Sequence, residues 1–395
     1  MKPIVRAGRM KPVHSDIRGP LFVEAMKRQK QGIDILKLNT GNPATFGFGL
    51  PDSIKNALME HMQDGVGYCD FKGMPQARQA ICDYETSKGI KGITPDDVFI
   101  GNGVSEVVSF ALTPLLNDGD EVLVPSPSYS LWGNSVYLED GKPVFYTCDE
   151  QANWYPDIQD IRSKITDKTK AIVIINPNNP TGVLYPKELL LEIIQIARES
   201  GLLIFADEIY DRLVMDGKQH ISLASLTEDV PVITLNGLSK SHCLCGYRCG
   251  WMIISGPREL TEDYRQGIIQ LTSLRLCANT MAQIVIPAAL DDMETPASMV
   301  RPGGRIYEQR EATVRELEKI DGLSFVKNDA AFYVFPKLDV KKFNITNDKQ
   351  FAHDLLDVTN ILLVPGSGFD WKDPDHFRIV MLPQADILSD AIRIT

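Results

Sequence analysis

Between about residue 98 and residue 255, short apolar runs rich in β-branched residues alternate with longer runs of helical period. The run VFIGNG (98–103) precedes SEVVSFALTPLLN, EVLVPSPSY precedes LWGNSVYLE, and AIVIINPNNPTG precedes KELLLEIIQIARES. The series continues with LLIFADEIY, PVITLNGLSK and GWMII. Strands that are apolar on both faces and separated by helices are typical of a mainly parallel sheet covered on each side. We therefore predict an α/β fold, with any ligand beyond the carboxyl ends of the strands.

The periodicity weakens near residue 290, and a length of 395 residues also favours more than one domain. The run MVRPGGRIYEQREATVRELEKI indicates a glycine-interrupted entry into a long helix, and LSFVKNDAAFYVFPKL, ILLVPGSGF and FRIVMLP indicate a small α+β unit. We predict an N-terminal arm at 1–45 that also joins the small domain, a large domain at 46–290 and a small C-terminal domain at 291–395. The end, DAIRIT, resembles an unfinished helix, which is compatible with a longer natural C-terminus.

The charge pattern excludes several classes of partner. The formal net charge is −11, with acidic and basic residues mixed throughout, which argues against a nucleic-acid footprint or a polybasic membrane anchor. No stretch has the apolar length of a signal peptide core or a membrane span, so a cytoplasmic location is the default expectation. Cys243, Cys245 and Cys249 lie close together but lack paired CxxC spacing, which favours reduced thiols near a site over a metal centre.

The junctions that follow the predicted strands carry polar residues suited to an aromatic ligand bearing a phosphate. In GNGVSEVV, Gly103, Val104 and Ser105 fall at a helix start, where free N–H groups bind phosphate or a serine acts only as a cap. Tyr129, in SPSYSLW, either stacks on a ligand ring or is an ordinary half-buried tyrosine. The rigid turn INPNNPTG aims Asn179 outward as a hydrogen-bond donor.

A carboxylate and a lysine complete this set. In LLIFADEIY, Asp207 and Glu208 directly follow apolar residues, and a carboxylate there needs a positive partner such as a pyridinium nitrogen, with Tyr210 in reach of the same ligand. In TLNGLSKSHCLCGYRCGW, Lys240 can form a Schiff base if burial and nearby cations lower its pKa, and Arg248 can bind a phosphate. A surface salt bridge, the default role of a lysine, fits poorly with the surrounding Gly, Leu, Ser and Cys residues.

Taken together, the motifs resemble those of a class I aminotransferase of the pyridoxal-phosphate fold type I superfamily. The resemblance runs from LKLNTGNP through GYCDFKG, GNGVSE, INPNNPTG, ADEIYD, LSK and CGYRCGW to HFRIVMLP. It implies a large domain with a mainly parallel mixed sheet between helices, a small α+β domain and an N-terminal arm. It also implies pyridoxal 5′-phosphate as cofactor, and amino acids and 2-oxo acids as substrates.

The resemblance also implies a role for each matching position. Lys240 resembles the lysine that binds the cofactor covalently and moves a proton, Asp207 the acid paired with the pyridine nitrogen, and Tyr129 the stacking aromatic residue. Donors to the ring oxygen are matched by Asn179 and Tyr210. The positions that match the phosphate cup are Gly103, Val104, Ser105, Ser239 and Arg248.

Further matches concern the substrate and a second subunit. Arg378 resembles the arginine that binds the substrate α-carboxylate, with the backbone of Gly41 nearby. Tyr68 matches a tyrosine that reaches the phosphate of the neighbouring subunit, which implies a homodimer with shared sites. The sequence departs from the family pattern at Gly237, where many members have a serine, so we assign Ser239 as the compensating hydroxyl.

Within the family, SDIRGP, GNPATFGF and RPGGRIYEQR resemble segments of bacterial alanine (glutamate–pyruvate) aminotransferases. A site that accepts both a methyl group and a second carboxylate needs a mobile cation, and we expect Arg18 of the arm to supply it. The alternative is that Arg18 only pins the arm. Ser15 stands where alanine-type relatives often have an aromatic residue, so the arm that carries Arg18 is expected to cover the site in a different way in detail.

Other activities are open on sequence grounds alone. An aromatic or branched-chain aminotransferase and a pyridoxal-phosphate lyase that cleaves carbon–sulfur bonds share the same motifs. A transcription regulator on this fold would need a DNA-binding module, for which about 45 residues before the core leave no room. A nicotinamide-dependent oxidoreductase would need GxGxxG after its first strand, and GNGVSE does not supply it.

Overall fold

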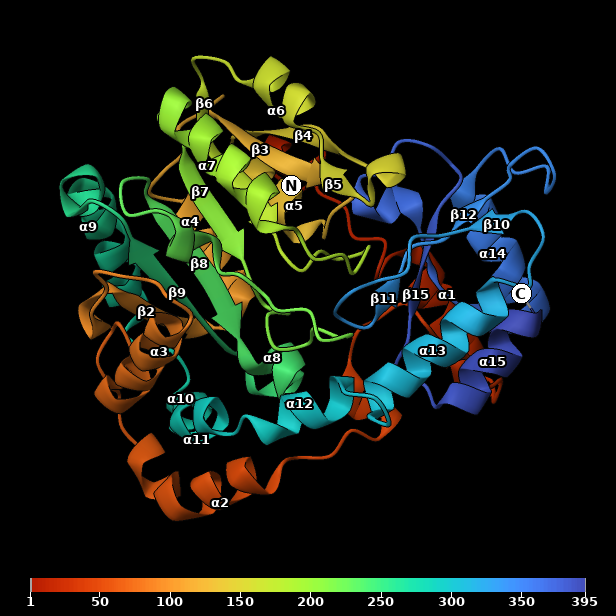
Figure 1. The fold of residues 1–395 in the computed structure, drawn as a ribbon, viewed down its shortest axis with the longest axis horizontal. Coiled ribbons are helices and arrows are strands. Elements are labelled where there is room, and N and C mark those ends of the chain that lie inside the picture. Colours follow the sequence, from red (N-terminus) through yellow and green to blue (C-terminus); the bar gives the residue numbers. More distant parts are fainter. Residues whose placement is uncertain (1, 395) are drawn as a thin grey trace.

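The central feature of the computed structural model is an eight-stranded sheet with the order β2-β9-β8-β7-β6-β3-β4-β5 (Figure 1). The structure describes residues 2–394. The pairs β3–β4, β3–β6, β6–β7 and β7–β8 are parallel, which confirms the predicted α/β class. The strands are β2 Val98–Asn102, β3 Glu121–Ser126, β4 Lys142–Asp149, β5 Tyr155–Pro156, β6 Thr169–Ile175, β7 Leu203–Asp207, β8 Val232–Gly237 and β9 Cys249–Ser255.

Helices bury both faces of this sheet, which explains why its strands are apolar at successive positions. On β6, Ile172 and Ile174 pack in one hydrophobic cluster with Leu190 of α7, whereas Val173 belongs to another cluster with Val108 of α4. The helices of these layers are α4 Val104–Leu112, α5 Leu131–Leu138, α6 Ile158–Lys164, α7 Lys187–Ser200 and α9 Arg258–Arg275.

Strand β9 runs antiparallel to both of its neighbours, so β2 and β8 point in the same direction. The carboxyl ends of β2, β3, β6, β7 and β8 therefore lie along one edge of the sheet. Because β9 is reversed, its first residues lie at that same edge. Gly250 is paired with Gly101 of β2 and with Gly237 of β8. The polar residues that follow five strands are thereby collected in one place.

A second group of helices covers the β2–β9 end of the sheet, where Ile81, Ile100 and Trp251 share a hydrophobic cluster with Val285. These helices are α2 Asp52–His61, α3 Pro75–Ser87, α8 Leu238–Ser241, α10 Thr280–Ile284 and α11 Ile286–Asp291. Within the described chain, no single helix has both the length and the apolar character to cross a membrane; α9 meets the criterion only together with Thr280–Asp291, at a bend of 119°.

The C-terminal part of the chain, together with a segment from its beginning, forms three small sheets beside the central one (Figure 1). Strand β1 pairs with β13, β10 pairs with β12, and β15 lies between β11 and β14. The strands are β1 Leu36–Lys37, β10 Leu323–Ser324, β11 Tyr333–Val334, β12 Lys337–Leu338, β13 Ile361–Leu362, β14 Val364–Pro365 and β15 Phe377–Val380. The helices are α1 Pro20–Lys30, α12 Glu294–Val300, α13 Arg305–Leu317, α14 Asp348–Thr359 and α15 Ala385–Ile394.

The predicted helices at both ends of the chain form where their sequence signals lie. The segment LFVEAMKRQK lies in α1, and the long helix expected after the glycine pair is α13, which begins directly after Gly304. The Asn347 side chain caps α14 by accepting hydrogen bonds from two backbone N–H groups. Short 3₁₀ helices are Gly8–Met10, Pro43–Phe46, Met62–Gly65, Pro95–Asp97, Glu150–Ala152, Leu223–Leu226, Cys245–Tyr247 and Gly366–Phe369.

Candidate active site

Lys240 lies in α8, immediately after β8, and its side chain crosses to a segment from the beginning of the chain. Its Nζ donates a hydrogen bond to the carbonyl oxygen of Gly41 at 2.8 Å. The Sγ of Cys245 lies 4.0 Å from Nζ and donates to the carbonyl oxygen of Ser239 at 2.9 Å. The amine is therefore held at the strand edge by a carbonyl oxygen and has no carboxylate partner among the described residues.

Several groups act on the pKa of Lys240. Burial lowers it, but the neighbouring Tyr333, Cys245 and Tyr129 raise it by more, so that the net shift is upward. The expectation of a lowered pKa was wrong for these protein groups, because phenols and a thiol, rather than a cluster of cations, surround the amine. Arg378 is the one neighbouring cation that lowers this pKa among the principal causes.

Asp207 is the last residue of β7, and its carboxylate is buried beneath the strand edge. Trp132 of α5 donates its indole N–H to Oδ2 at 3.1 Å, and the backbone N–H of Ile209 donates to Oδ1 at 3.4 Å. Burial raises the pKa of Asp207 to about 6. An isolated buried carboxylate of this kind favours a positively charged or proton-donating ligand. Trp132 was not identified from the sequence, where it looked like an ordinary residue of a helix.

Two predicted site residues bind side chains that come from the C-terminal part of the chain. Asn179 accepts a hydrogen bond at 2.9 Å from Arg378 through its Oδ1, and Tyr210 donates its hydroxyl to the Tyr333 hydroxyl at 3.0 Å. The guanidinium of Arg378 lies over the Tyr333 ring at 4.5 Å. Tyr333 thus contacts both Tyr210 and Arg378. In the sequence, nothing in AFYVFP marked it as more than a strand residue.

Arg378 is 1 % exposed, and within residues 2–394 no carboxylate lies at ion-pair distance from its guanidinium. Its Nη2 donates to the carbonyl oxygen of Asn39, while its Nε has no partner in the described chain. Burial lowers the pKa of this guanidinium. A buried cation is costly unless an anion meets it, so this arrangement favours a carboxylate ligand.

The start of α4 and the start of β9 approach each other closely. Gly103 has φ 84° and precedes the first residue of the helix, Val104. A Cβ atom on Gly103 would lie 2.2 Å from Nη2 of Arg248, and one on Gly250 would lie 2.4 Å from the Val104 nitrogen. Only glycine permits this approach. The result is a shallow cradle of free helix N–H groups with a guanidinium above it, a favourable place for phosphate.

The remaining cup residues differ in their exposure. Ser105 is exposed and Ser239 is half-buried. Glu106, in the same helix turn, directs its carboxylate to the Asn102 backbone N–H and to Arg275, so its charge is partly neutralised. A Cβ atom on Gly237 would lie 2.5 Å from the carbonyl oxygen of Cys249. The departure from serine at this position therefore has a steric reason, since the β9 backbone occupies the space of a side chain.

Of the remaining predicted residues, Tyr129 and Gly41 lie at this centre, whereas Tyr68 and Arg18 are at the surface. Tyr129 follows β3, is half-buried and is close enough to affect the pKa values of Lys240 and Arg378. Tyr68 is 84 % exposed in the loop that precedes α3. Arg18 is exposed, and its side chain forms no ion pair within the described residues. Gly41, by contrast, is buried against the Tyr333 hydroxyl.

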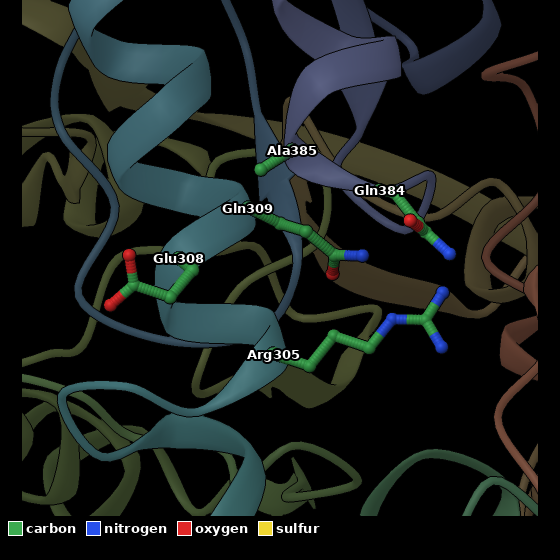
Figure 2. Close-up of a pocket in the computed structure, with 5 residues that line it drawn as sticks. All are labelled: Arg305, Glu308, Gln309, Gln384 and Ala385. Carbon is green, nitrogen blue, oxygen red and sulfur yellow. The ribbon is translucent and has the colours of Figure 1, made fainter.

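A separate surface pocket of about 290 Å³ lies between α13 and the start of α15 (Figure 2). Figure 2 shows Arg305 and Gln384 on the same side of this pocket, with the Glu308 carboxylate turned the other way. Arg305 also stacks on the Phe48 ring at 4.0 Å and donates to the carbonyl oxygen of Phe46. None of the predicted site residues lines this pocket, although Arg305, Glu308 and Gln309 belong to the segment RPGGRIYEQR. Arg305 thereby connects α13 to the loop that contains Phe46 and Phe48.

The family model of the aminotransferases of class I and II matches residues 33–391. The chain belongs to the class I and II aminotransferases. Glutamate-pyruvate aminotransferase of Haemophilus influenzae is 50 % identical over 99 % of this chain and 97 % of its own length. A crystal structure of an Escherichia coli aminotransferase superposes with a TM-score of 0.98 at 47 % identity, covering 100 % of this chain and 97 % of the other.

Another solved relative is more distant in sequence. Alanine aminotransferase of Pyrococcus furiosus has a TM-score of 0.93 at 41 % identity and covers 99 % of this aminotransferase and 98 % of its own chain. The agreement extends over the central sheet and over the C-terminal strands that carry Tyr333 and Arg378. The family assignment therefore rests on nearly the whole chain rather than on one motif.

Proposed function

We propose that this aminotransferase moves an amino group between L-alanine and 2-oxoglutarate, giving pyruvate and L-glutamate, with pyridoxal 5′-phosphate as its cofactor. The observation that carries the proposal is the buried guanidinium of Arg378, which lacks a carboxylate among the described residues and faces the strand edge that holds Lys240. The names of the relatives support the choice of alanine and glutamate.

The residues at the strand edge fit this cofactor. The cradle at Gly103, Val104 and Arg248 suits a phosphate, and the buried Asp207 carboxylate suits a pyridinium nitrogen. Asn179 and Tyr210 can donate to a ring oxygen, and Tyr129 can stack on the ring. When bound, pyridoxal phosphate supplies a carbonyl group for the amine and a ring that withdraws electrons from the substrate α-carbon.

Lys240 has two tasks in this proposal: it binds the cofactor and later takes and returns a proton of the substrate. For the second task its amine must be neutral, although Tyr333 and Cys245 raise its pKa in the protein alone. Its hydrogen bond to Gly41 must also break. Cationic groups close to Nζ favour the neutral amine, and Arg378 already acts in this direction.

Arg378 would bind the α-carboxylate that all the substrates share. Its guanidinium is fixed by Asn179 and by the carbonyl oxygen of Asn39, so it needs no rearrangement to receive a carboxylate. The hydrogen bonds leave Nε without a protein partner in the described chain. An arginine fork that is fixed in this way selects substrates by their carboxylate and leaves the side chain to other residues.

Arg18 would bind the second carboxylate of glutamate and 2-oxoglutarate. The Asn39 side chain donates to the carbonyl oxygen of Ile17 at 2.8 Å, and the Asn39 carbonyl accepts from Arg378. Arg18 directly follows Ile17, and Ile17 is hydrogen-bonded to Asn39, the residue that contacts Arg378. Because Arg18 is exposed, it has room to move over the site when a second carboxylate arrives and to withdraw for alanine.

The protein would act as a homodimer with shared active sites. Tyr68 extends from an exposed stretch that also presents large apolar side chains to solvent. These are Met59, Met62 and Val66, exposed by 68 %, 57 % and 77 %. Such a group of exposed apolar side chains favours burial against a second copy. Tyr68 would then reach the phosphate cup of the partner.

The decisive experiment is a visible absorption spectrum of the purified protein after incubation with pyridoxal phosphate. We expect a yellow band that L-alanine bleaches and 2-oxoglutarate restores, without release of ammonia. Lys240→Ala should lose the yellow band and at least ~10³-fold in turnover, because both of its tasks are lost. Lys218→Ala is the matched control, since Lys218 is half-exposed and pairs with Asp329 at the surface.

Each other outcome changes a different part of the proposal. A yellow protein that does not respond to alanine would retain the cofactor but direct the substrate search to aromatic, branched-chain and sulfur-containing amino acids. Release of ammonia and pyruvate without a 2-oxo acid would favour a lyase. A protein that takes up no cofactor would contradict the proposal. For Arg18→Ala, we expect a higher KM for glutamate and 2-oxoglutarate with an unchanged KM for alanine; unchanged kinetics for all three would exclude its role.

A further inference from the structure

A buried cluster of charged residues lies behind the segment that follows β7. Along this segment Asp207 and Tyr210 belong to the active site, whereas Glu208 and Asp211 contact the other side. There they meet Lys88, the C-cap residue that directly follows α3. The Nζ of Lys88 lies 2.8 Å from Oε2 of Glu208 and 3.1 Å from Oδ2 of Asp211. The Lys88 ammonium therefore joins Glu208 and Asp211. Each of these carboxylates directly follows a site residue, Asp207 or Tyr210.

Other elements fix the same two carboxylates. Glu208 accepts hydrogen bonds from the Ser222 hydroxyl at 2.9 Å and from the Leu223 backbone N–H at 3.0 Å. Asp211 accepts from the Tyr84 hydroxyl at 2.6 Å and from the Asn236 amide at 2.7 Å. The segment is thus connected to α3, to the 222–223 turn and to β8. Lys88 contacts both carboxylates, and its removal would weaken the two attachments together.

The balance of charge depends on Lys88. Burial lowers the pKa of Lys88, but Glu208, Glu85 and Asp211 raise it by more, so it remains an ammonium. Burial raises the pKa of Glu85, whose Oε2 lies 2.8 Å from the same Nζ. Burial also acts to raise the pKa of Asp211, but Lys88 and other neighbours outweigh it and the net shift is downward. Without the ammonium, the buried carboxylates would have to protonate or admit water.

Two further charged or titratable side chains face the cluster. His220 lies 3.8 Å from Oε2 of Glu208, and burial lowers its pKa, so it is neutral at pH 7 and does not replace the ammonium. Arg212 stacks on the Tyr84 ring at 4.3 Å but donates to the carbonyl oxygens of Ala289 and Leu290. Neither side chain bridges Glu208 and Asp211. Lys88 is the cation that does so within residues 2–394.

We propose that Lys88 is a positioning residue of the transamination site: its ammonium holds Glu208 and Asp211 from behind and thereby fixes the turn that presents Asp207 and Tyr210. This inference rests on the proposed function. The Asp207 carboxylate has one side-chain donor, Trp132, and otherwise takes its place from the backbone of this turn. A displacement of about 1 Å in a catalytic group can cost ~10²-fold in rate.

The test compares Lys88→Met with Lys91→Met in the loaded dimer. Lys91 is a matched control because it lies three positions away and pairs with Glu228 at the exposed surface. For Lys88→Met, we expect a kcat about 30-fold lower and a KM for alanine within about 3-fold of the wild type, because the hydrogen bonds that fix Arg378 go to Asn179 and Asn39, which lie outside this turn. The pH midpoint at which the visible cofactor band titrates should also shift by about 0.5 unit or more, since Asp207 moves.

A second variant keeps the test decisive if the first fails to fold. Lys88→Met combined with Glu208→Gln removes the ammonium together with the charge of one carboxylate that it neutralises. The same changes in kcat and in the pH midpoint of the cofactor band are expected. Folded variants with wild-type kcat and midpoint, even at a lower Tm, would overturn the inference and leave Lys88 a structural residue only. Wild-type protein that fails to respond to alanine would instead contradict the proposed function, so the two failures are distinguishable.

Discussion

The Nζ of Lys240 and the carbonyl oxygen of Gly41 form a hydrogen bond of 2.8 Å, which joins the end of β8 to the beginning of the chain. Two residues before Gly41, the carbonyl oxygen of Asn39 accepts from Arg378. The short segment 39–41 therefore contacts both the lysine and the arginine of the proposed mechanism. Both side chains are therefore hydrogen-bonded to the same short backbone segment, although Lys240 and Arg378 are 138 positions apart in sequence, from residue 240 to residue 378.

Replacement of Arg378 by lysine should weaken substrate binding. Lysine keeps the charge but cannot form the planar fork that contacts Asn179 and the Asn39 carbonyl oxygen while leaving Nε free. We expect kcat/KM for alanine to fall by about 100-fold, mainly through KM. Steady-state kinetics measure this, with Arg301→Lys as the control because Arg301 pairs with Glu294 at the surface. An unchanged KM would exclude Arg378 as the carboxylate ligand.

Asp207→Asn should alter the pH dependence of stability in the protein freed of cofactor. Burial raises the pKa of Asp207 from 3.8 to about 6, so the native protein holds a proton that the unfolded chain has already lost. The wild type therefore loses stability as pH rises from about 4 to 6 and does not recover it above 6, a loss of about 3 kcal/mol. The amide cannot ionise and should avoid this loss.

Urea unfolding at pH 4.5 and pH 7.5 measures the free energy of unfolding of both proteins. On going from pH 4.5 to pH 7.5, the free energy of unfolding of the wild type should fall further, or rise less, than that of the variant. The contributions of the other titrating groups are the same in both proteins and cancel in this comparison. Equal pH dependence would show that Asp207 ionises freely in the native protein and would contradict the role of burial. The charge-removing change should also weaken retention of the cofactor, which dialysis followed by absorbance checks.

Gly237→Ala should destabilise the sheet near the phosphate cradle. The new Cβ would lie 2.5 Å from the Cys249 carbonyl oxygen and 3.0 Å from the Gly250 Cα, so β8 and β9 must separate. We expect a loss of about 1–3 kcal/mol in the free energy of unfolding. Gly246→Ala is the control, since a Cβ there meets no atom within 4 Å. Equal stability of the two variants would mean that the strands shift easily.

Mixed dimers should test whether Tyr68 acts across subunits. Lys240→Ala and Tyr68→Ala homodimers are expected to be impaired, for lack of the amine and of the partner's phosphate contact respectively. When equal amounts are refolded together, half of the dimers are hybrids, and each hybrid has one intact site. Activity should therefore recover to about a quarter of the wild type. If mixing adds nothing beyond the average of the two homodimers, Tyr68 does not serve the neighbouring site.

The sequence predicted the parts of the site that depend on chain order. Asp207 ends β7, Lys240 and Asn179 come a few residues after β8 and β6, and the direction of those strands places all three at one edge. Trp132 and Tyr333 could not be predicted in this way, because each meets its partner through packing of distant segments. Tyr210 and Tyr333 are 123 positions apart and each looked like an ordinary core aromatic residue.

The predicted direction of the pKa shift of Lys240 was wrong for a related reason. Its shift depends on Tyr333, Cys245 and Tyr129, which come from three different segments, so no local pattern around Lys240 could reveal its direction. The cluster around Lys88 was missed because α3 and the turn after β7 are 120 positions apart at the Lys88–Glu208 contact. The domain boundaries after residues 45 and 290 stay a prediction.

The buried charge of Arg378 should also couple the stability of the fold to the binding of a carboxylate. A guanidinium that is 1 % exposed and has no carboxylate partner in residues 2–394 destabilises the folded chain until an anion meets it. A carboxylate that binds there binds only the native state, and its concentration shifts the folding equilibrium. Plentiful amino acids and 2-oxo acids would then be expected to protect the chain from proteolysis, and scarcity to reduce that protection. The abundance of the enzyme would follow the supply of its own substrates without any change in gene expression.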